Sequence, residues 1–263
     1  CRSRTTWLCE QAKLAGFRPM CTVIIGSQLS AECPLWIAAN RDEFWSRPAA
    51  PPTLSQHAGL ATLAPTDQVA GGTWIGANAA GLLVAVTNRF GQLPDPTRRS
   101  RGALVRDALV YRSVDEAEQY VAALSASDYN PFHLVVADAD SVLLVIHRGA
   151  TIERKRLPPG LHVVTERSFS DVAALREEWL RRQLAHQDAA TLDRERWLPT
   201  LLSVHDDSDP LARVCIHAPA RQYGTRSSSI LERLPLRHVI RYRYADGPPC
   251  QTPFAEQTLS LVL

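Results

Sequence analysis

The chain reads MCTVIIGSQ at residues 20–28, and this stretch decides both the expected fold and the expected chemistry. Initiator methionine is commonly removed before a small residue, so a chain translated from Met20 begins at Cys21 after processing. A cysteine thiol has a reference pKa of about 8.5, and an α-amine has one of about 7.7–8.0. An amine on the nucleophile's own residue can act as its base. The stretch predicts a strand that starts with a nucleophile needing no separate histidine, although a Met-Cys pair also arises by chance.

Polar side chains follow the next apolar run. Residues 34–40 (PLWIAAN) form a nearly continuous apolar segment, which is typical of a strand buried on both faces. Asn40, Arg41, Asp42 and Glu43 close this run, so we expect them where the strand emerges from the sheet. A fixed carboxylate such as that of Asp42 can hold an α-ammonium or position a thiolate. The alternative is an ordinary polar turn.

Two later motifs can complete a site. Thr87-Asn88 ends another apolar strand, and an asparagine amide can donate to an oxyanion. Arg226 enters a late strand within YGTRSS at 223–228, where a guanidinium can bind a substrate carboxylate or the region of the reacting carbonyl. The ordinary alternatives are a turn residue for Asn88 and an ion pair with a structural carboxylate for Arg226.

The order of the expected elements favours an α+β fold. Apolar runs bounded by turn signals predict strands that alternate with two pairs of helices, and residues 44–66 are expected to be mostly loop because of their four prolines. Hairpins dominate, so we expect two mainly antiparallel sheets stacked face to face with helices outside each, a four-layer αββα sandwich. The expected strands are 21–28, 34–40, 69–76, 81–87, 132–138, 142–148, 161–165, 213–218, 225–234, 237–244 and 257–263, and the expected helices are 101–112, 114–125, 171–187 and 191–203.

Composition separates the first residues from the rest. Residues 1–19 carry a net charge of about +3, which leaves about −1 for residues 20–263 of a chain whose total is +2. We therefore expect a leader over 1–19, either a mis-set start or a propeptide, followed by one domain over 20–263. The domain has no basic excess, so nucleic-acid binding is not expected. No apolar run approaches the roughly 20 residues of a membrane span.

Six cysteines are scattered without a CxxC pair, which favours free thiols in a reducing, cytoplasmic compartment. The eight histidines show no tight metal-binding spacing, so we expect no metal site and no cofactor. The expected partner is a small acyl substrate or a hydrophobic ligand, and the sequence does not define the oligomeric state.

Taken together, these motifs resemble the NRDE family, which includes the transport and Golgi organisation 2 proteins. The resemblance runs in order from residue 20 to the C-terminus. It is carried by Met20-Cys21, Asn40-Arg41-Asp42-Glu43, Arg47-Pro48, Gly71-Gly72-Thr73-Trp74-Ile75-Gly76, Thr87-Asn88 and Tyr223-Gly224-Thr225-Arg226-Ser227-Ser228.

The resemblance implies the fold of N-terminal-nucleophile hydrolases, which include choloylglycine hydrolases and penicillin V acylases. It implies Cys21 as nucleophile, Asp42 as the group that holds the α-amine, and Asn88 in the oxyanion hole. Asn40, Arg41 and Arg226 are then candidates for substrate binding.

The chain departs from those hydrolases at two positions. Ala39 stands where they carry an arginine, and Glu166 stands near the place of a second oxyanion asparagine. A carboxylate there would repel an oxyanion.

Three functions follow as hypotheses. The first is an amidohydrolase or acyltransferase in which Cys21 attacks an acyl carbonyl. The second is a non-enzymatic carrier of haem or another hydrophobic ligand, although His147 and His162 lie in strand-like segments and neither is a strong candidate ligand. The third is an interaction protein that keeps the fold without the chemistry, which Ala39 and Glu166 favour.

Overall fold

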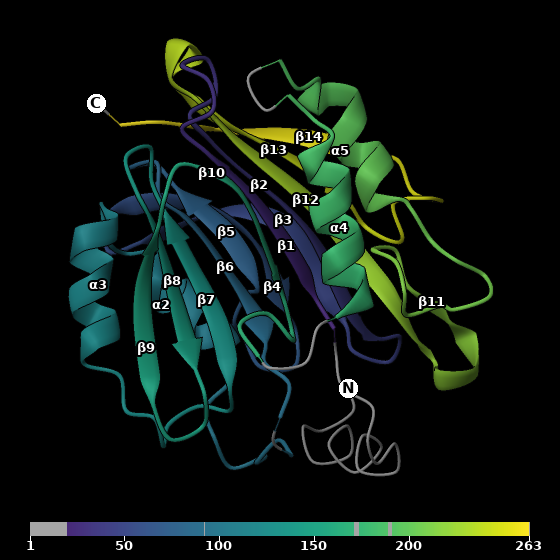
Figure 1. Cartoon of the computed structure of the whole chain (residues 1–263). Coiled ribbons are helices and arrows are strands. Elements are labelled where there is room, and N and C mark those ends of the chain that lie inside the picture. Colours follow the sequence, from purple (N-terminus) through teal and green to yellow (C-terminus); the bar gives the residue numbers. More distant parts are fainter. Residues whose placement is uncertain (1–19, 92, 171–173, 189–190, 263) are drawn as a thin grey trace.

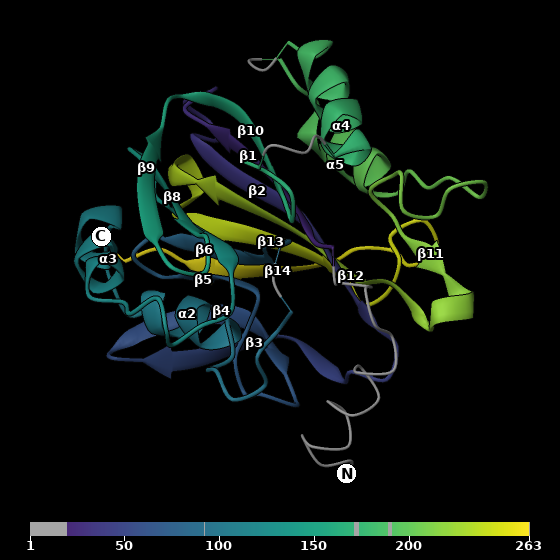
Figure 2. The same ribbon diagram turned by 60° about the horizontal axis from the view of Figure 1, so that its bottom comes forward.

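The computed structural model describes residues 20–91, 93–170, 174–188 and 191–262, and residues 1–19, the predicted leader, lie outside them. Two seven-stranded sheets are stacked face to face, and helices cover the outer face of each (Figures 1 and 2). The paired strands run antiparallel in both sheets. This is the four-layer α+β sandwich that the element order predicts.

The first sheet contains the two strands that bear the N-terminal motifs. Its order is β10-β1-β2-β12-β13-β14, and β11 pairs with β12. The central position of β1 and β2 explains their apolar sequences, because both faces of these strands are covered. The strands are β1 (Thr22–Ser27), β2 (Leu35–Phe44), β10 (Gly160–Thr165), β11 (His217–Ala218), β12 (Tyr223–Leu234), β13 (Val239–Ala245) and β14 (Ala255–Ser260).

The second sheet follows the chain without a crossover, in the order β3-β4-β5-β6-β7-β8-β9. Successive antiparallel strands need only short turns, so this sheet is a meander. Its strands are β3 (Ala49–His57), β4 (Leu60–Asp67), β5 (Ile75–Asn78), β6 (Leu83–Asn88), β7 (Phe132–Ala137), β8 (Val142–His147) and β9 (Ile152–Leu157).

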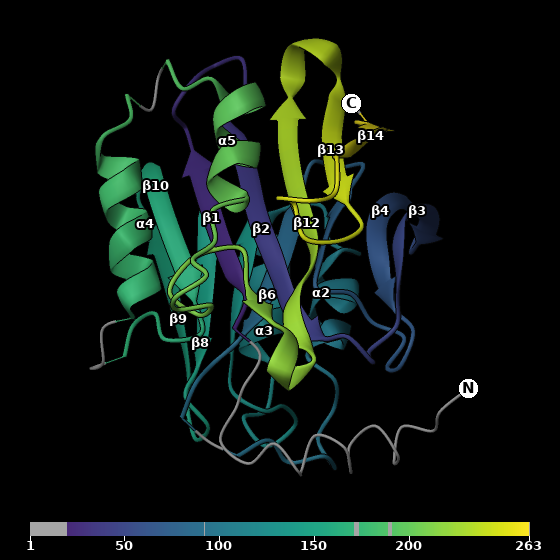
Figure 3. The ribbon, with the colours of Figure 1, turned by 90° about the vertical axis from the view of Figure 1, so that its right-hand side faces the viewer.

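Alternation along the strands divides the core into layers. Val23 and Ile25 of β1 face the second sheet, whereas Ile24 faces the helices α4 (Leu175–Ala185) and α5 (Arg194–Leu202). These two helices lie over β10, β1 and β2, as Figure 3 shows. The helices α2 (Gly102–Ala108) and α3 (Val114–Ala122) cover the second sheet in the same way. Two short 3-10 turns, η1 (Pro219–Arg221) and η2 (Pro235–Arg237), flank β12.

The loop predicted for residues 44–66 is wrong, because β3 and β4 form a hairpin there. β3 lies at the edge of the sheet, and the pairing is irregular between Ala50 and Thr53, where Pro51 and Pro52 sit. Proline lacks an N–H and is tolerated at such edge and bulge positions. The sequence also missed β9, and the strand predicted from residue 69 begins only at Ile75.

Among the helices of the described residues, none is both long enough and apolar enough to cross a bilayer.

Candidate active site

The start of β1 meets the ends of two other strands. Thr22 pairs with Asn40 of β2 on one side and with Thr165, the last residue of β10, on the other. The backbone N–H of Phe90, two residues after β6 ends at Asn88, donates to the Glu166 carbonyl oxygen at 2.8 Å. Cys21, which precedes β1, and Asn88 therefore lie at the same end of the sandwich, where the two sheets approach each other.

Cys21 is partly exposed just before β1 begins. Its Sγ lies 3.9 Å from the carbonyl oxygen of Asp42, so the thiol sits against β2. Burial, reinforced by the negative charge of Asp42, raises the pKa of this thiol to about 12. The nitrogen of Cys21 is an amide while Met20 precedes it, and in that state the thiol has no adjacent amine to deprotonate it.

Asp42 is buried and only partly neutralised. Its Oδ1 accepts a hydrogen bond of 2.6 Å from the Thr225 hydroxyl. Its Oδ2 lies 3.6 Å from Nη1 of Arg176 and has no hydrogen-bond partner among the described residues. Burial raises the pKa of Asp42 to about 8, even though Arg176 and Thr225 act in the opposite direction.

Asp42→Asn is expected to change how stability depends on pH in the chain that retains Met20. The ordinary pKa of an aspartate is about 4, and the pKa of Asp42 in the folded protein is about 8. Between these values the folded state holds a proton that the unfolded state has lost, so the Asp42 contribution to stability falls as pH rises. Asp42→Asn has no titrating carboxyl at this position, so its stability does not fall in this way. The free energy of unfolding of the variant, minus that of wild type, is expected to rise by about 1 kcal/mol per pH unit between about pH 4 and pH 8, as measured by urea unfolding.

A matched variant separates this effect from a general charge effect. Asp140→Asn removes a carboxylate that is exposed to solvent. It is expected to leave the slope of unfolding free energy against pH close to that of wild type. A flat difference between Asp42→Asn and wild type over pH 4 to 8 would contradict the raised pKa.

Glu166 does not stand as an isolated negative charge. Its carboxylate forms a close ion pair with Arg176, and both side chains are almost fully buried. Arg167 adds a second guanidinium at 3.8 Å. The negative charge of Glu166, which departs from the asparagine of the related hydrolases, is therefore balanced by Arg176, and the same guanidinium also faces Asp42. Sequence reasoning missed Arg176, which lies more than a hundred residues from Asp42 and belongs to a helix with an otherwise ordinary charged sequence.

Tyr223 is a second residue that the sequence analysis missed. It is fully buried, and its hydroxyl accepts a 2.6 Å hydrogen bond from the backbone N–H of Met20. Burial and the negative charge of Asp42 raise its pKa well above 10, so the hydroxyl remains protonated. Tyr223 and Thr225 are two residues apart on β12 and share a face. The alternating positions of Tyr223 and Thr225 within YGTRSS were the sequence signal that could have placed both residues beside Asp42.

The prediction that Asn40 to Glu43 emerge from the sheet is wrong. All four lie inside β2 and are buried, because β1 pairs with this strand up to Asn40 and β12 pairs with it along its length. The amide of Asn40 donates to the carbonyls of Leu202 and Val214, at 2.9 and 3.0 Å. Asn40 therefore fastens the outer segment that follows α5 to the sheet. Arg41 points to the other face, where its guanidinium stacks over Trp74 at 4.3 Å.

Arg226 occupies a β-bulge in β12. Thr225 pairs with Asp42 and Ser227 pairs with Arg41, so Arg226 is the extra residue between them. Its Nε is buried and has no hydrogen-bond partner among the described residues. A bulge redirects a side chain out of the regular alternation, which suits a group that must reach a ligand. No hydrogen bond or ion pair within the described part of the chain joins Arg226 or Asn88 to Cys21, so their roles at the site stay predictions.

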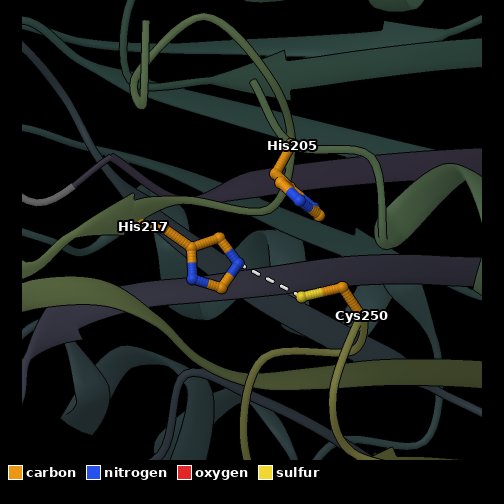
Figure 4. Close-up of side chains that lie close together, drawn as sticks. All are labelled: His205, His217 and Cys250. Atoms are coloured by element: carbon orange, nitrogen blue, oxygen red, sulfur yellow. Dashed lines mark hydrogen bonds between the residues drawn. The ribbon is translucent and has the colours of Figure 1, made fainter. Parts of the chain in front are cut away.

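His147 and His162, the two histidines considered as haem ligands, each place Nε2 within hydrogen-bond distance of a backbone carbonyl oxygen. His147 is buried, stacks on Phe132, and places its Nε2 at 3.0 Å from the Ala126 carbonyl oxygen. Nε2 of His162 lies 2.8 Å from the Pro158 carbonyl oxygen. Within the described ranges, the grouping of side chains that could hold a metal is a different one, formed by His205, His217 and Cys250 (Figure 4).

Comparison with known proteins defines both the family and the fold. The family model described as Transport and Golgi organisation 2 matches residues 20–233. The Transport and Golgi organization protein 2 homolog of Bos taurus is 30% identical over 233 residues, covering 75% of this chain and 81% of its own. The Homo sapiens homolog is 29% identical over 237 residues, with the same two coverages of 75% and 81%.

Solved structures agree with the fold. The Caenorhabditis elegans ortholog of N-acylethanolamine-hydrolyzing acid amidase aligns with a TM-score of 0.57 at 13% identity, covering 92% of this chain and 100% of that one. A variant of conjugated bile acid hydrolase from Clostridium perfringens aligns with a TM-score of 0.53 at 10% identity, covering 92% and 98%. Both have the N-terminal-nucleophile hydrolase fold, so the predicted fold is confirmed.

Proposed function

The chain belongs to the Transport and Golgi organisation 2 family, and from this premise we propose that it is a cysteine N-terminal-nucleophile amidohydrolase or acyltransferase that acts on an acyl amide or thioester. The observation that carries the proposal is the position of Cys21 immediately before β1, where its Sγ lies 3.9 Å from the backbone carbonyl oxygen of Asp42, a residue whose buried carboxylate has one unsatisfied oxygen. The similar solved proteins, by their names an amidase and a hydrolase, support the same class of reaction.

The proposed reaction starts with loss of the residues before Cys21. The α-amine that this frees takes the proton of the Cys21 thiol, and the thiolate attacks the acyl carbonyl carbon. The carbonyl oxygen becomes an oxyanion, to which the Asn88 amide and backbone N–H groups donate. The C–N or C–S bond to the leaving group then breaks, and the α-ammonium returns the proton to that group. An acyl thioester on Cys21 remains.

The second half of the reaction regenerates the enzyme. Water, or another acceptor, gives a proton to the α-amine and attacks the thioester carbonyl. The thiolate leaves and recovers a proton from the α-ammonium, so no proton is gained or lost by the protein over the cycle. Asp42 holds the ammonium throughout, and Thr225 and Arg176 hold Asp42. Asn40 acts as a positioning residue, since both of its donors are already bonded within the protein.

The direct test is covalent capture of the acyl group. The chain translated from Met20, with its N-terminal mass verified, is incubated with a panel of acyl amides and thioesters and analysed by intact mass and peptide mapping. We expect an acyl adduct on Cys21 that Cys21→Ala abolishes completely. Cys33→Ala serves as the matched control because it removes another free cysteine, buried against the outer helices. An unmodified Cys21 across the panel, with no effect of Cys21→Ala on turnover, would end the enzyme proposal.

A further inference from the structure

A second chemical cluster lies apart from Cys21, between the segment after α5 and the turn after β13. Sγ of Cys215 lies 3.4 Å from Nε2 of His217 and 3.6 Å from Sγ of Cys250. Nε2 of His217 lies 3.1 Å from Sγ of Cys250. His205 stands beside this trio, with its ligand atom within 4.8 Å of those of His217 and Cys250 (Figure 4).

The two contacts made by Cys215 match the edges of a tetrahedron around one metal ion. With Zn–S bonds of about 2.3 Å and Zn–N bonds of about 2.0–2.1 Å, two sulfur ligands stand about 3.7 Å apart and a sulfur and a nitrogen about 3.5 Å apart. The contacts made by Cys215 fall within about 0.2 Å of these values. The His217–Cys250 contact of 3.1 Å is shorter, and His205, whose ligand atom lies within 4.8 Å of those two, would move inward to become the fourth ligand. We propose that Cys215, His217, Cys250 and His205 bind one zinc ion in a closed structural site.

The chemistry of the four side chains suits zinc. Two thiolates and two neutral imidazoles form the Cys2His2 set of structural zinc sites and neutralise the charge of the ion. Binding releases one proton from each thiol, so the affinity rises with pH. Nδ1 of His205 lies 3.2 Å from the Ser203 carbonyl oxygen, and a proton donated there leaves the lone pair on Nε2 for the metal. Nε2 of His205 also lies 4.0 Å from the carboxylate of Asp207.

The site joins parts of the chain that are distant in sequence. His217 begins β11, Cys215 lies two residues earlier, and Cys250 lies in the turn between β13 and β14. The same segment supports the proposed active site. The Val214 carbonyl accepts from Asn40, and the Thr225 hydroxyl that donates to Asp42 accepts from the N–H of Ile216. A metal bound here would fix the segment that holds Asn40 and Thr225 in place.

The test uses cobalt(II) as a spectroscopic substitute for zinc. The full chain is reduced, freed of metal with a chelator and titrated with cobalt(II) alone. We expect saturation at one equivalent, with the intense visible bands of tetrahedral cobalt and a near-ultraviolet thiolate charge-transfer band. Added zinc is expected to abolish both. Cys250→Ser and His217→Ala are expected to remove most of the signal, and the exposed His205→Ala to shift the visible bands as water replaces the imidazole.

Two controls assign the signal to this site. Cys21→Ala is expected to leave the cobalt spectrum unchanged, so the result does not depend on whether the chain is an enzyme. His186→Ala removes an exposed histidine at the end of α4 and is likewise expected to have no effect. Because Cys215 is buried and its replacement could unfold the chain, the exposed His205 provides the variant that tests the site in a folded protein.

Three results would overturn the proposal. The first is the absence of tetrahedral bands at one equivalent in the reduced wild type. The second is a spectrum that Cys21→Ala removes but Cys250→Ser does not. The third concerns a chain in which Cys215 and Cys250 have formed a disulfide. If that chain takes up no zinc after the disulfide is reduced again, as measured by metal analysis of the gel-filtered protein, the two thiols do not bind the metal.

Discussion

Inserting one alanine between Met20 and Cys21 is expected to lower the rate of acyl transfer by about 10²–10⁴-fold, the usual contribution of a general base. Processing of the inserted chain leaves alanine in front, so the nitrogen of Cys21 becomes an amide and cannot accept the thiol proton. Burial raises the pKa of this thiol to about 12 in the chain that retains Met20, and the inserted chain likewise has no α-ammonium on Cys21 to lower it. The rate is measured with whichever acyl donor labels the parent chain.

The insertion must be separated from simple misfolding. Cys21 precedes β1, so an added residue does not enter a paired strand. Far-ultraviolet circular dichroism and the unfolding midpoint are expected to match those of the parent. An inserted chain with the parental rate would show that the α-amine is not the base. A chain with Cys21→Ala gives the floor against which both rates are compared.

Arg176→Met is expected to destabilise the folded chain by about 3–5 kcal/mol, the cost of breaking a buried ion pair by removing one partner. Arg176 is the cation that the Glu166 and Asp42 carboxylates share, and all three side chains are almost completely excluded from water. Without it, two buried carboxylates face each other with no opposing charge from α4. Urea unfolding at neutral pH measures the loss.

The expected loss has a distinctive pH dependence and a matched control. Arg176 lowers the pKa of Asp42, which is about 8 in wild type, so Asp42 in the variant holds its proton to a higher pH. The penalty for Arg176→Met is therefore expected to grow as pH rises past about 8. Arg181→Met changes a residue of the same helix, but Arg181 is exposed, and its partner Glu177 keeps its hydrogen bonds from Thr165 and Ser168. Its cost is expected to be about 0–1 kcal/mol. Equal losses for the two variants would show that the buried pair is not the source of the effect.

Local patterns along the chain predicted most of the strands. Apolar runs such as 22–27 and 83–88 are short, bounded by turn residues and covered on both faces, so composition alone indicates them. The same reasoning gives the wrong result at Pro51 and Pro52, because proline usually indicates a loop. These two prolines lie in β3, an edge strand, and the edge position depends on how the whole sheet is assembled. An edge strand tolerates proline because one side of it has no neighbouring strand that needs the missing N–H.

The site was predictable only in part, for a related reason. Cys21 and Asp42 became candidates because each adjoins an apolar run that the sequence reveals as a strand. Arg176 could not be predicted from the sequence, because Asp42 and Glu166 come close to it only when α4 packs on β10 and β2. His217 and Cys250 are separated by two strands, and the Cys215-x-His217 spacing was the single local hint of their cluster.

The hydrogen bond between the Met20 amide and the Tyr223 hydroxyl has a consequence for maturation. Cleavage before Cys21 deletes that amide and, in the same event, creates a new cationic end one residue further along. In the proposed mature protein the Tyr223 hydroxyl therefore lacks the donor that it has in the unprocessed chain. We expect the α-ammonium of Cys21, one residue further along, to take the place of that donor.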